Sequence, residues 1–213
     1  MAAVPSWLRR AVPDAQGLAG KEVDDIAITA GTAICALDAV VRRQERWAGA
    51  WRQRLALAAG AVTVRQAGRV EDEAALRDTV LLTRSGDDVG PAGRMFLGWR
   101  RLALRPTEEL LTKASIAKVL EDFGHARGDE MVGDLADELR QLAATEGAVG
   151  MLTDAFVAVQ RCDLPRSVGC WLADALLAQR LGWNHATPLL GGEAALAMSA
   201  GKSRRTVTVI AAT

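Results

Sequence analysis

Two aspartates, Asp38 and Asp174, stand inside apolar stretches of the sequence and are the first candidates for chemistry. Each one interrupts a run with helical spacing, at residues 35–41 and 171–177. A buried carboxylate is costly unless it is paired, so an acid in such a place needs a partner. Arg52 is a natural partner on a neighbouring helix, because a guanidinium can bind a carboxylate with two hydrogen bonds.

Two interpretations of this group of residues stay open. In the first, Asp38, Asp174 and Arg52 line a polar pocket between helices, and the protein is an enzyme. In the second, the acids lie at helix edges or form structural ion pairs with Arg52, Arg54 or Arg77. We expect at least one of the two acids to have a structural role, and Asp174 is the better candidate for it.

His125 is the better candidate of the two histidines for a catalytic or metal-binding role. Asp122 precedes it by three residues, a spacing that can place two metal ligands on one face of a helix. A di-metal carboxylate bundle needs a second such pair, and the other histidine, His185, has no acid close before it. We therefore expect no metal or other cofactor, and we interpret His125 as a surface-loop or capping residue.

The sequence does not match the common nucleotide-binding motifs. Gly201-Lys202-Ser203 resembles the end of a phosphate-binding loop, but Leu196 stands where that motif requires its first glycine. The sequence contains no glycine-rich dinucleotide fingerprint, no paired Cys-x-x-Cys and no Gly-x-Ser-x-Gly. We therefore expect no nucleotide-binding site of these kinds.

Binding of nucleic acid through arginine side chains is a third possibility, and the least supported. Four arginines fall in an expected helix at 91–104 or directly after it, namely Arg94, Arg100, Arg101 and Arg105. A nucleic-acid-binding protein usually carries a basic excess, whereas this chain has 26 basic and 26 acidic residues. The balance of charge disfavours a nucleic-acid partner.

The elements that must position these residues are all expected to be helices. The strongest signal is the stretch 47–59, where Trp47 and Trp51 would share one face of a helix that packs inside. Apolar residues at spacings of three and four, with capping and stop residues, predict helices at 23–44, 48–66, 74–83, 91–104, 107–122, 129–145, 151–161 and 168–181. The sequence thus predicts an all-α domain of about seven to nine helices around a central Trp-bearing helix.

The predicted domain has an irregular segment at each end. Prolines and glycines mark residues 1–21 as an irregular arm, the helical domain spans 22–200, and residues 201–213 form a loose tail. No leader pattern and no apolar run of about 18 residues is visible, and the three cysteines do not form a dense framework. We therefore expect a cytoplasmic protein with no membrane segment.

The chain also resembles an uncharacterised bacterial family of unknown function. The residues that carry the resemblance lie at 48–57, 71–78, 90–94 and 171–183. The resemblance implies a helical cytoplasmic protein and supplies no activity, ligand or catalytic residue. Together with the missing catalytic motifs, it leads us to expect a non-enzymatic interaction or regulatory module that binds a protein partner or itself.

Helix content gives a direct test of the fold prediction. Periodicity predicts that helices hold the majority of residues, and far-UV circular dichroism of the purified chain measures this. We expect a spectrum dominated by helix, and a spectrum dominated by β-structure would contradict the all-α prediction.

Overall fold

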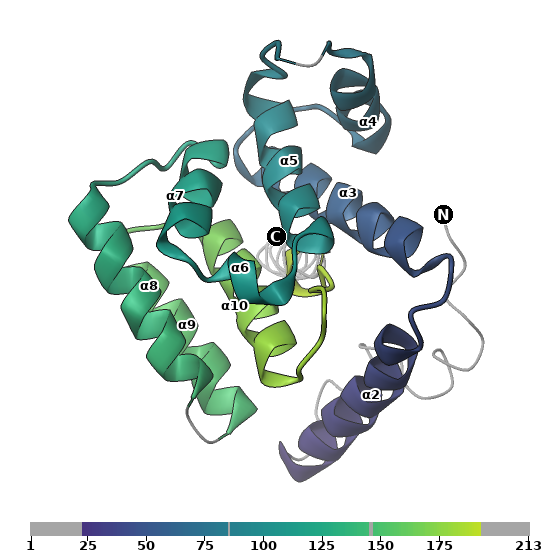
Figure 1. The fold of residues 1–213 in the computed structure, drawn as a ribbon, viewed down its shortest axis with the longest axis vertical. Coiled ribbons are helices and arrows are strands. Elements are labelled where there is room, and N and C mark those ends of the chain that lie inside the picture. The colour runs from purple at the N-terminus through teal and green to yellow at the C-terminus, as the bar shows by residue number, and fades with distance from the viewer. Residues whose placement is uncertain (1–22, 85, 145–146, 193–213) are drawn as a thin grey trace, which may run out of the picture. The chain divides into compact units, whose positions relative to one another are not determined.

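The computed structural model describes residues 23–84, 86–144 and 147–192 of the chain. Within these ranges every regular element is a helix, apart from one isolated bridge between Pro106 and His185, and the all-α prediction is confirmed. The helices, shown in Figure 1, are α2 (Val23–Arg43), α3 (Ala48–Gln66), α4 (Glu73–Leu82), α5 (Gly90–Leu104), α6 (Thr107–Leu110), α7 (Lys113–Asp122), α8 (Asp129–Ala143), α9 (Ala148–Arg161) and α10 (Arg166–Arg180).

The chain divides into two compact units, residues 1–48 and 49–213. Helix α2 belongs to the first unit, and the helices from α3 onward make up the described part of the second. The predicted arm at 1–21 and tail at 201–213 lie outside the described residues, so these boundaries stay predictions. None of the described helices is both long enough and apolar enough to cross a membrane.

Side-chain caps determine where helices of the second unit begin. Asp72 accepts a hydrogen bond of 2.8 Å from the Ala75 amide at the start of α4. The single helix predicted at 107–122 is wrong, because the chain breaks there into α6 and α7. Thr112 causes the break, since its hydroxyl accepts from the Ser115 amide at 3.3 Å and donates to the Glu109 carbonyl at 2.9 Å.

Four of the described helices of the second unit have a residue with left-handed φ two positions after their last residue. These residues are Gly68, Gly124, Asp163 and Gly182, with φ of 76°, 79°, 49° and 63°. After α10 the Gly182 amide donates to the Gln179 carbonyl at 3.1 Å, and the Trp183 amide donates to the Ala178 carbonyl at 2.9 Å. This pair of bonds is the Schellman arrangement, which satisfies the last carbonyls of a helix. Gly68 and Gly182 lie just after the helices predicted at 48–66 and 168–181, and these two predicted helix ends are confirmed to within one residue.

The buried core of the second unit runs along α10. All eleven residues from 168 to 178 of this helix are buried. Helix α10 contacts α5, α6, α8 and α9, and Figure 1 shows α8 and α9 running side by side next to it. A helix that is mostly apolar all round belongs in the interior of a fold, and residues 168–178 of α10 are buried on every side.

Trp47 and Trp51 do not form the predicted inner face. Helix α3 begins at Ala48, so Trp47 lies in the preceding turn, where the four-residue spacing of a helix does not apply. The Trp47 side chain is 47% exposed. Among the described tryptophans, Trp99 on α5 and Trp171 on α10 are fully buried.

Both of these buried indoles have a hydrogen-bond acceptor. Trp99 Nε1 donates to Thr63 Oγ1 at 2.8 Å, and Trp171 Nε1 donates to the Gly98 carbonyl at 2.9 Å. An unpaired buried N–H would cost about 1–3 kcal/mol, so these bonds make the burial of the indoles tolerable. They also tie α5 to α3 on one side and to α10 on the other.

Gly191 lies directly on the ring of Trp99. A Cβ atom at this position would be 2.4 Å from Trp99 Cη2 and 2.8 Å from the Cβ of Ala59. At the next position, Gly192, a Cβ would have no atom within 4 Å. Only a glycine at 191 therefore lets the chain pass so close to the indole.

The difference in space around Gly191 and Gly192 predicts that alanine is destabilising at position 191 and nearly neutral at position 192. Gly191→Ala should lower the free energy of unfolding by about 1–3 kcal/mol, because the new methyl group overpacks the core. Gly192→Ala, the matched control, should change it by less than about 1 kcal/mol in either direction. Urea denaturation measures both, and equal effects of the two variants would contradict the packing described for Gly191.

Candidate functional site

Asp174 is the most deeply buried acid among the described residues, and backbone amides engage it. It lies on α10 with 1% of its surface exposed. Its carboxylate accepts from the Leu189 amide at 2.9 Å and from the Leu190 amide at 3.2 Å. The amides of 189 and 190 stand at the start of a helical turn, where N–H groups have no partner within the helix. Asp174, a residue of α10, therefore caps the helical turn that begins at residues 189 and 190.

The pKa of Asp174 reflects two opposing influences. Burial, the larger influence, raises the pKa from 3.8 to about 8, although the amides of Leu190, Leu189 and Gly191 favour the charged form. Between about pH 4 and pH 8 the acid is therefore protonated in the folded protein and ionised in the unfolded chain. Unfolding releases a proton in this range, so the stabilising contribution of Asp174 falls as the pH rises through it.

Arg52 lies elsewhere in the second unit and has a different partner. Its Nε donates to the carbonyl of Ala103 at 3.1 Å, in the last turn of α5. A guanidinium suits a helix C-terminus, where carbonyls are unpaired and the helix dipole is negative. Burial lowers the pKa of Arg52, and the charge of Arg52 adds to burial in lowering the pKa of His185. The Arg52 guanidinium thus satisfies a carbonyl at the C-terminal end of α5.

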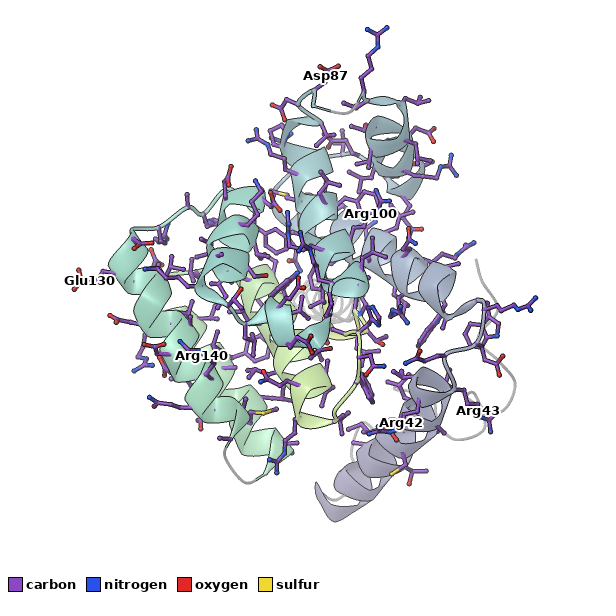
Figure 2. All side chains as sticks on the ribbon, viewed as in Figure 1. Arg42, Arg43, Asp87, Arg100, Glu130 and Arg140 are labelled. Carbon is purple, nitrogen blue, oxygen red and sulfur yellow. The ribbon has the colours of Figure 1, made fainter. Side chains whose placement is uncertain are left out.

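Asp38 lies on α2 in the first unit and is only partly buried. Both of its oxygens accept from Arg42 Nε, at 2.9 Å and 2.8 Å, and Arg42 is labelled in Figure 2. This is a pair four residues apart on one helix, of the kind that contributes a few tenths of a kcal/mol. Asp38, Asp174 and Arg52 therefore each engage a different group.

Asp122 is buried and faces two cations. Arg101 Nη2 lies 2.9 Å from its Oδ2, and Lys118 Nζ lies 3.2 Å from its Oδ1. His125 follows α7, and its backbone amide donates to the Leu120 carbonyl at 2.7 Å as part of the helix stop at Gly124. Burial, followed by the charge of Arg127, lowers the pKa of the His125 imidazole.

Within the described ranges, no three side chains of His, Cys, Asp or Glu are grouped so that they could hold a metal ion. The cations around Asp122 use the carboxylate oxygens that a metal ion would need. Burial also raises the pKa of the Cys170 thiol to about 11, so the thiolate that binds metals is disfavoured there.

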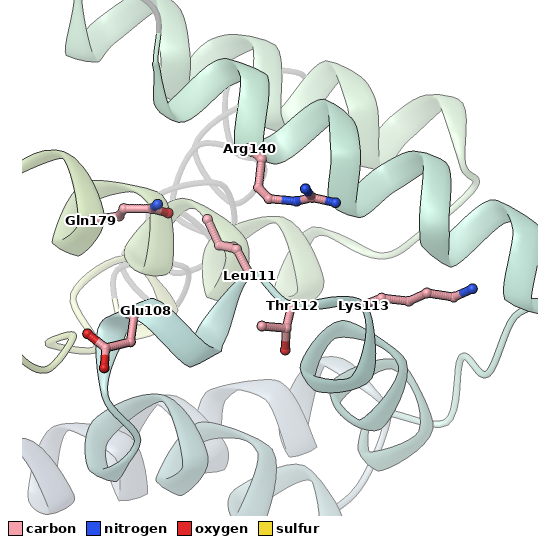
Figure 3. Close-up of a pocket in the computed structure, with 6 residues that line it drawn as sticks. All are labelled: Glu108, Leu111, Thr112, Lys113, Arg140 and Gln179. Carbon is pink, nitrogen blue, oxygen red and sulfur yellow. The ribbon is translucent and has the colours of Figure 1, made fainter.

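One hollow of about 280 Å³ lies where α6, the start of α7, α8 and α10 meet. Figure 3 shows its charged residues, and the carboxylate of Glu108 and the amine of Lys113 point toward opposite ends of it. Lys113 Nζ is 2.5 Å from Asp129, and Arg140 is paired with Asp137. A catalytic site needs groups that converge on one point, and these groups diverge.

A second hollow, of about 180 Å³, lies among α3, α4 and α5 and has an apolar floor. We call it the α3/α4/α5 groove and define it by its lining residues Gln53, Arg54, Leu57, Arg77, Val80, Leu81, Phe96 and Arg100. Leu81 is 67% exposed and the adjacent Leu82 is 82% exposed. The sequence did not reveal this groove, because apolar residues in a predicted helix such as 74–83 indicate core positions as readily as a binding surface.

The pKa of Asp174 leads to a testable pH dependence. The difference in free energy of unfolding between the wild type and Asp174→Asn should shift against the wild type as the pH rises from about 4 to about 8. The limiting slope is about 1.4 kcal/mol per pH unit, because one proton is released on unfolding. Guanidinium denaturation at several pH values measures it, with Asp38→Asn, at an acid that is only partly buried, as the control. If the difference in free energy of unfolding between the wild type and Asp174→Asn does not change with pH, the raised pKa of Asp174 is contradicted.

Comparison with known proteins adds the family of the chain. No curated protein and no solved structure matches it. One family model, described as "Protein of unknown function (DUF1403)", matches residues 1–208, nearly the whole sequence. The match agrees with the resemblance drawn from the helical segments and brings no activity with it. The chain belongs to this family of unknown function, DUF1403.

Proposed function

We propose that this chain is a protein-interaction module whose binding surface is the α3/α4/α5 groove. The observation that carries the proposal is the apolar lining of the groove, with Leu57, Val80 and Phe96 as its floor and the exposed Leu81 beside them. Leu81 leaves two thirds of its surface in solvent, with an exposed fraction of 67%. Covering such a side chain with apolar groups of a partner would gain about 1.5–3 kcal/mol at full burial.

The size and setting of the groove suit one helix of a partner protein. A volume of about 180 Å³ holds one or two apolar side chains. Proteins that bind an amphipathic helix use such hollows for anchors on one face of that helix, three or four residues apart. We therefore propose a helical segment of another protein as the occupant.

The floor of the groove rests on a packed cluster, which favours a preformed site. Phe96 is buried in a cluster with Ala61, Val64, Leu76 and Ala92, and Leu57 and Val80 pack against that cluster. A Cβ at Gly60 on α3 would be 3.2 Å from the Cα of Phe96, so α3 and α5 approach closely there. A preformed floor reduces the entropy that binding costs.

The other two interpretations receive less support. Asp174 holds backbone amides and Arg52 holds a carbonyl, contacts that favour structural roles over a shared catalytic pocket. Three arginines of the Arg94–Arg105 region have carboxylate partners, in the pairs Arg94–Asp88, Arg101–Asp122 and Arg105–Glu109. Of these three, Arg101 has a buried partner, Asp122, and the balance of 26 basic and 26 acidic residues gives the chain no basic excess for nucleic acid.

A crosslinking experiment followed by affinity measurement tests the proposal. A photoreactive amino acid at position 81 of the full chain captures proteins in native cells, and the same amino acid at position 149 is the control. Val149 on α9 is 80% exposed, so it matches Leu81 in exposure and lies on another helix. The captured protein is then purified and its Kd is measured.

The affinities decide the outcome. Leu81→Gln should weaken binding at least about tenfold, because apolar burial is lost, whereas Val149→Gln should leave the Kd unchanged. Both positions are exposed, so neither substitution should unfold the protein. Equal Kd values for the wild type and Leu81→Gln would contradict binding at the groove.

A further inference from the structure

We propose that the partner segment is an acidic amphipathic helix, with carboxylates that meet Arg54, Arg77 and Arg100 at the rim of the groove. This inference rests on the proposed function and names the chemistry of the partner. The three arginines come from three different helices, α3, α4 and α5, and all of them line the same hollow. Figure 2 marks Arg100 on α5.

The positive charge of the rim is largely uncompensated. Neither Arg54 nor Arg100 forms an ion pair with any described residue, and no carboxylate lines the groove. Arg77 Nη2 is 2.7 Å from Asp78, but this pair joins two neighbouring residues whose side chains are 56% and 52% exposed. Exposed pairs contribute little, so Arg77 can turn to another carboxylate at small cost.

In the hollow between α5 and α7, by contrast, carboxylates compensate the positive charge. It is also lined by cations, Arg101, Arg105 and Lys118, but Glu109 lines it as well and pairs with Arg105 at 2.9 Å. Lys118 is likewise paired, with Glu121 at 2.9 Å. The chain has no net charge, so the excess at the α3/α4/α5 groove comes from local placement.

The positive charge of the rim and the apolar floor of the groove together indicate which class of partner fits. A rim of guanidinium groups binds carboxylates through paired hydrogen bonds, and the floor needs apolar side chains. An amphipathic helix with acidic flanks offers both on adjacent faces. Nucleic acid would present phosphates to the arginines, but bases stack on open aromatic faces and Phe96 is only 7% exposed.

A set of designed peptides tests the inference with the full-length chain. The first peptide is a helix of about 18 residues with leucines on one face and glutamates along both edges of that face. The second has glutamine in place of every glutamate, and the third has the composition of the first in a scrambled order. Fluorescence anisotropy gives each Kd at about 0.02 M and 0.15 M salt.

We expect the glutamate peptide to bind about tenfold more tightly than the glutamine peptide at low salt, and salt should reduce this difference. The double variant Arg54→Gln/Arg100→Gln removes two of the three arginines, so it should remove most of the preference for glutamate and leave binding of the glutamine peptide unchanged. The matched control is Arg65→Gln/Arg180→Gln, since both residues are exposed and neither lines the groove. Circular dichroism of each variant checks that the fold is retained.

The other outcomes separate this inference from the proposed function. Equal binding of the glutamate and glutamine peptides, weakened for both by Leu81→Gln, would overturn the acidic partner and leave the groove as the binding surface. Failure of both peptides to bind better than the scrambled one would overturn both proposals. Binding to anionic lipid vesicles or single-stranded DNA that the Arg54/Arg100 variant alone loses would assign the rim to phosphate instead.

Discussion

The described part of the second unit depends on one buried carboxyl group, which holds the segment at residues 189 and 190 against the central helix α10. Asp174 on α10 accepts from the amides of Leu189 and Leu190. The segment it holds places Gly191 on the ring of Trp99. Trp99 in turn donates to Thr63 on α3. A single acid thus links α10, the segment that it holds and, through one indole, both α5 and α3.

The same linkage explains why the proposed binding surface has a fixed shape. Trp99 and Phe96 lie on one helix, α5, and the Trp99–Thr63 bond and the close approach at Gly60 hold that helix against α3. Helix α4 completes the groove through Leu76, which is buried in the same cluster as Phe96. Packed interiors respond to a binding partner with small movements, so the three helices that carry the arginines keep a constant spacing. The rim can therefore recognise one pattern of carboxylates.

Sequence patterns were enough to predict the helical class and several helix ends, because those depend on neighbours in the chain. The stops at Gly68 and Gly182 are of this kind. The context of Asp174 suggested burial, but its partners are amides 15 and 16 residues later, which no local pattern reveals. The break at Thr112 was missed because a threonine inside a helix pattern shows no sign that its side chain will cap a new one. Leu81 could not be told from a core leucine, since exposure depends on packing between helices.

Methyl NMR of the full chain tests most directly whether the α3/α4/α5 groove is the binding surface. Leucine and valine methyl groups are labelled, and the acidic amphipathic peptide is added. Shifts should appear at Leu57, Val80 and Leu81, which line the groove, whereas Leu172 and Leu176 inside α10 should stay unchanged. Shifts concentrated at Val149 and Val157 on α9, with none at Leu57, Val80 and Leu81, would contradict the account.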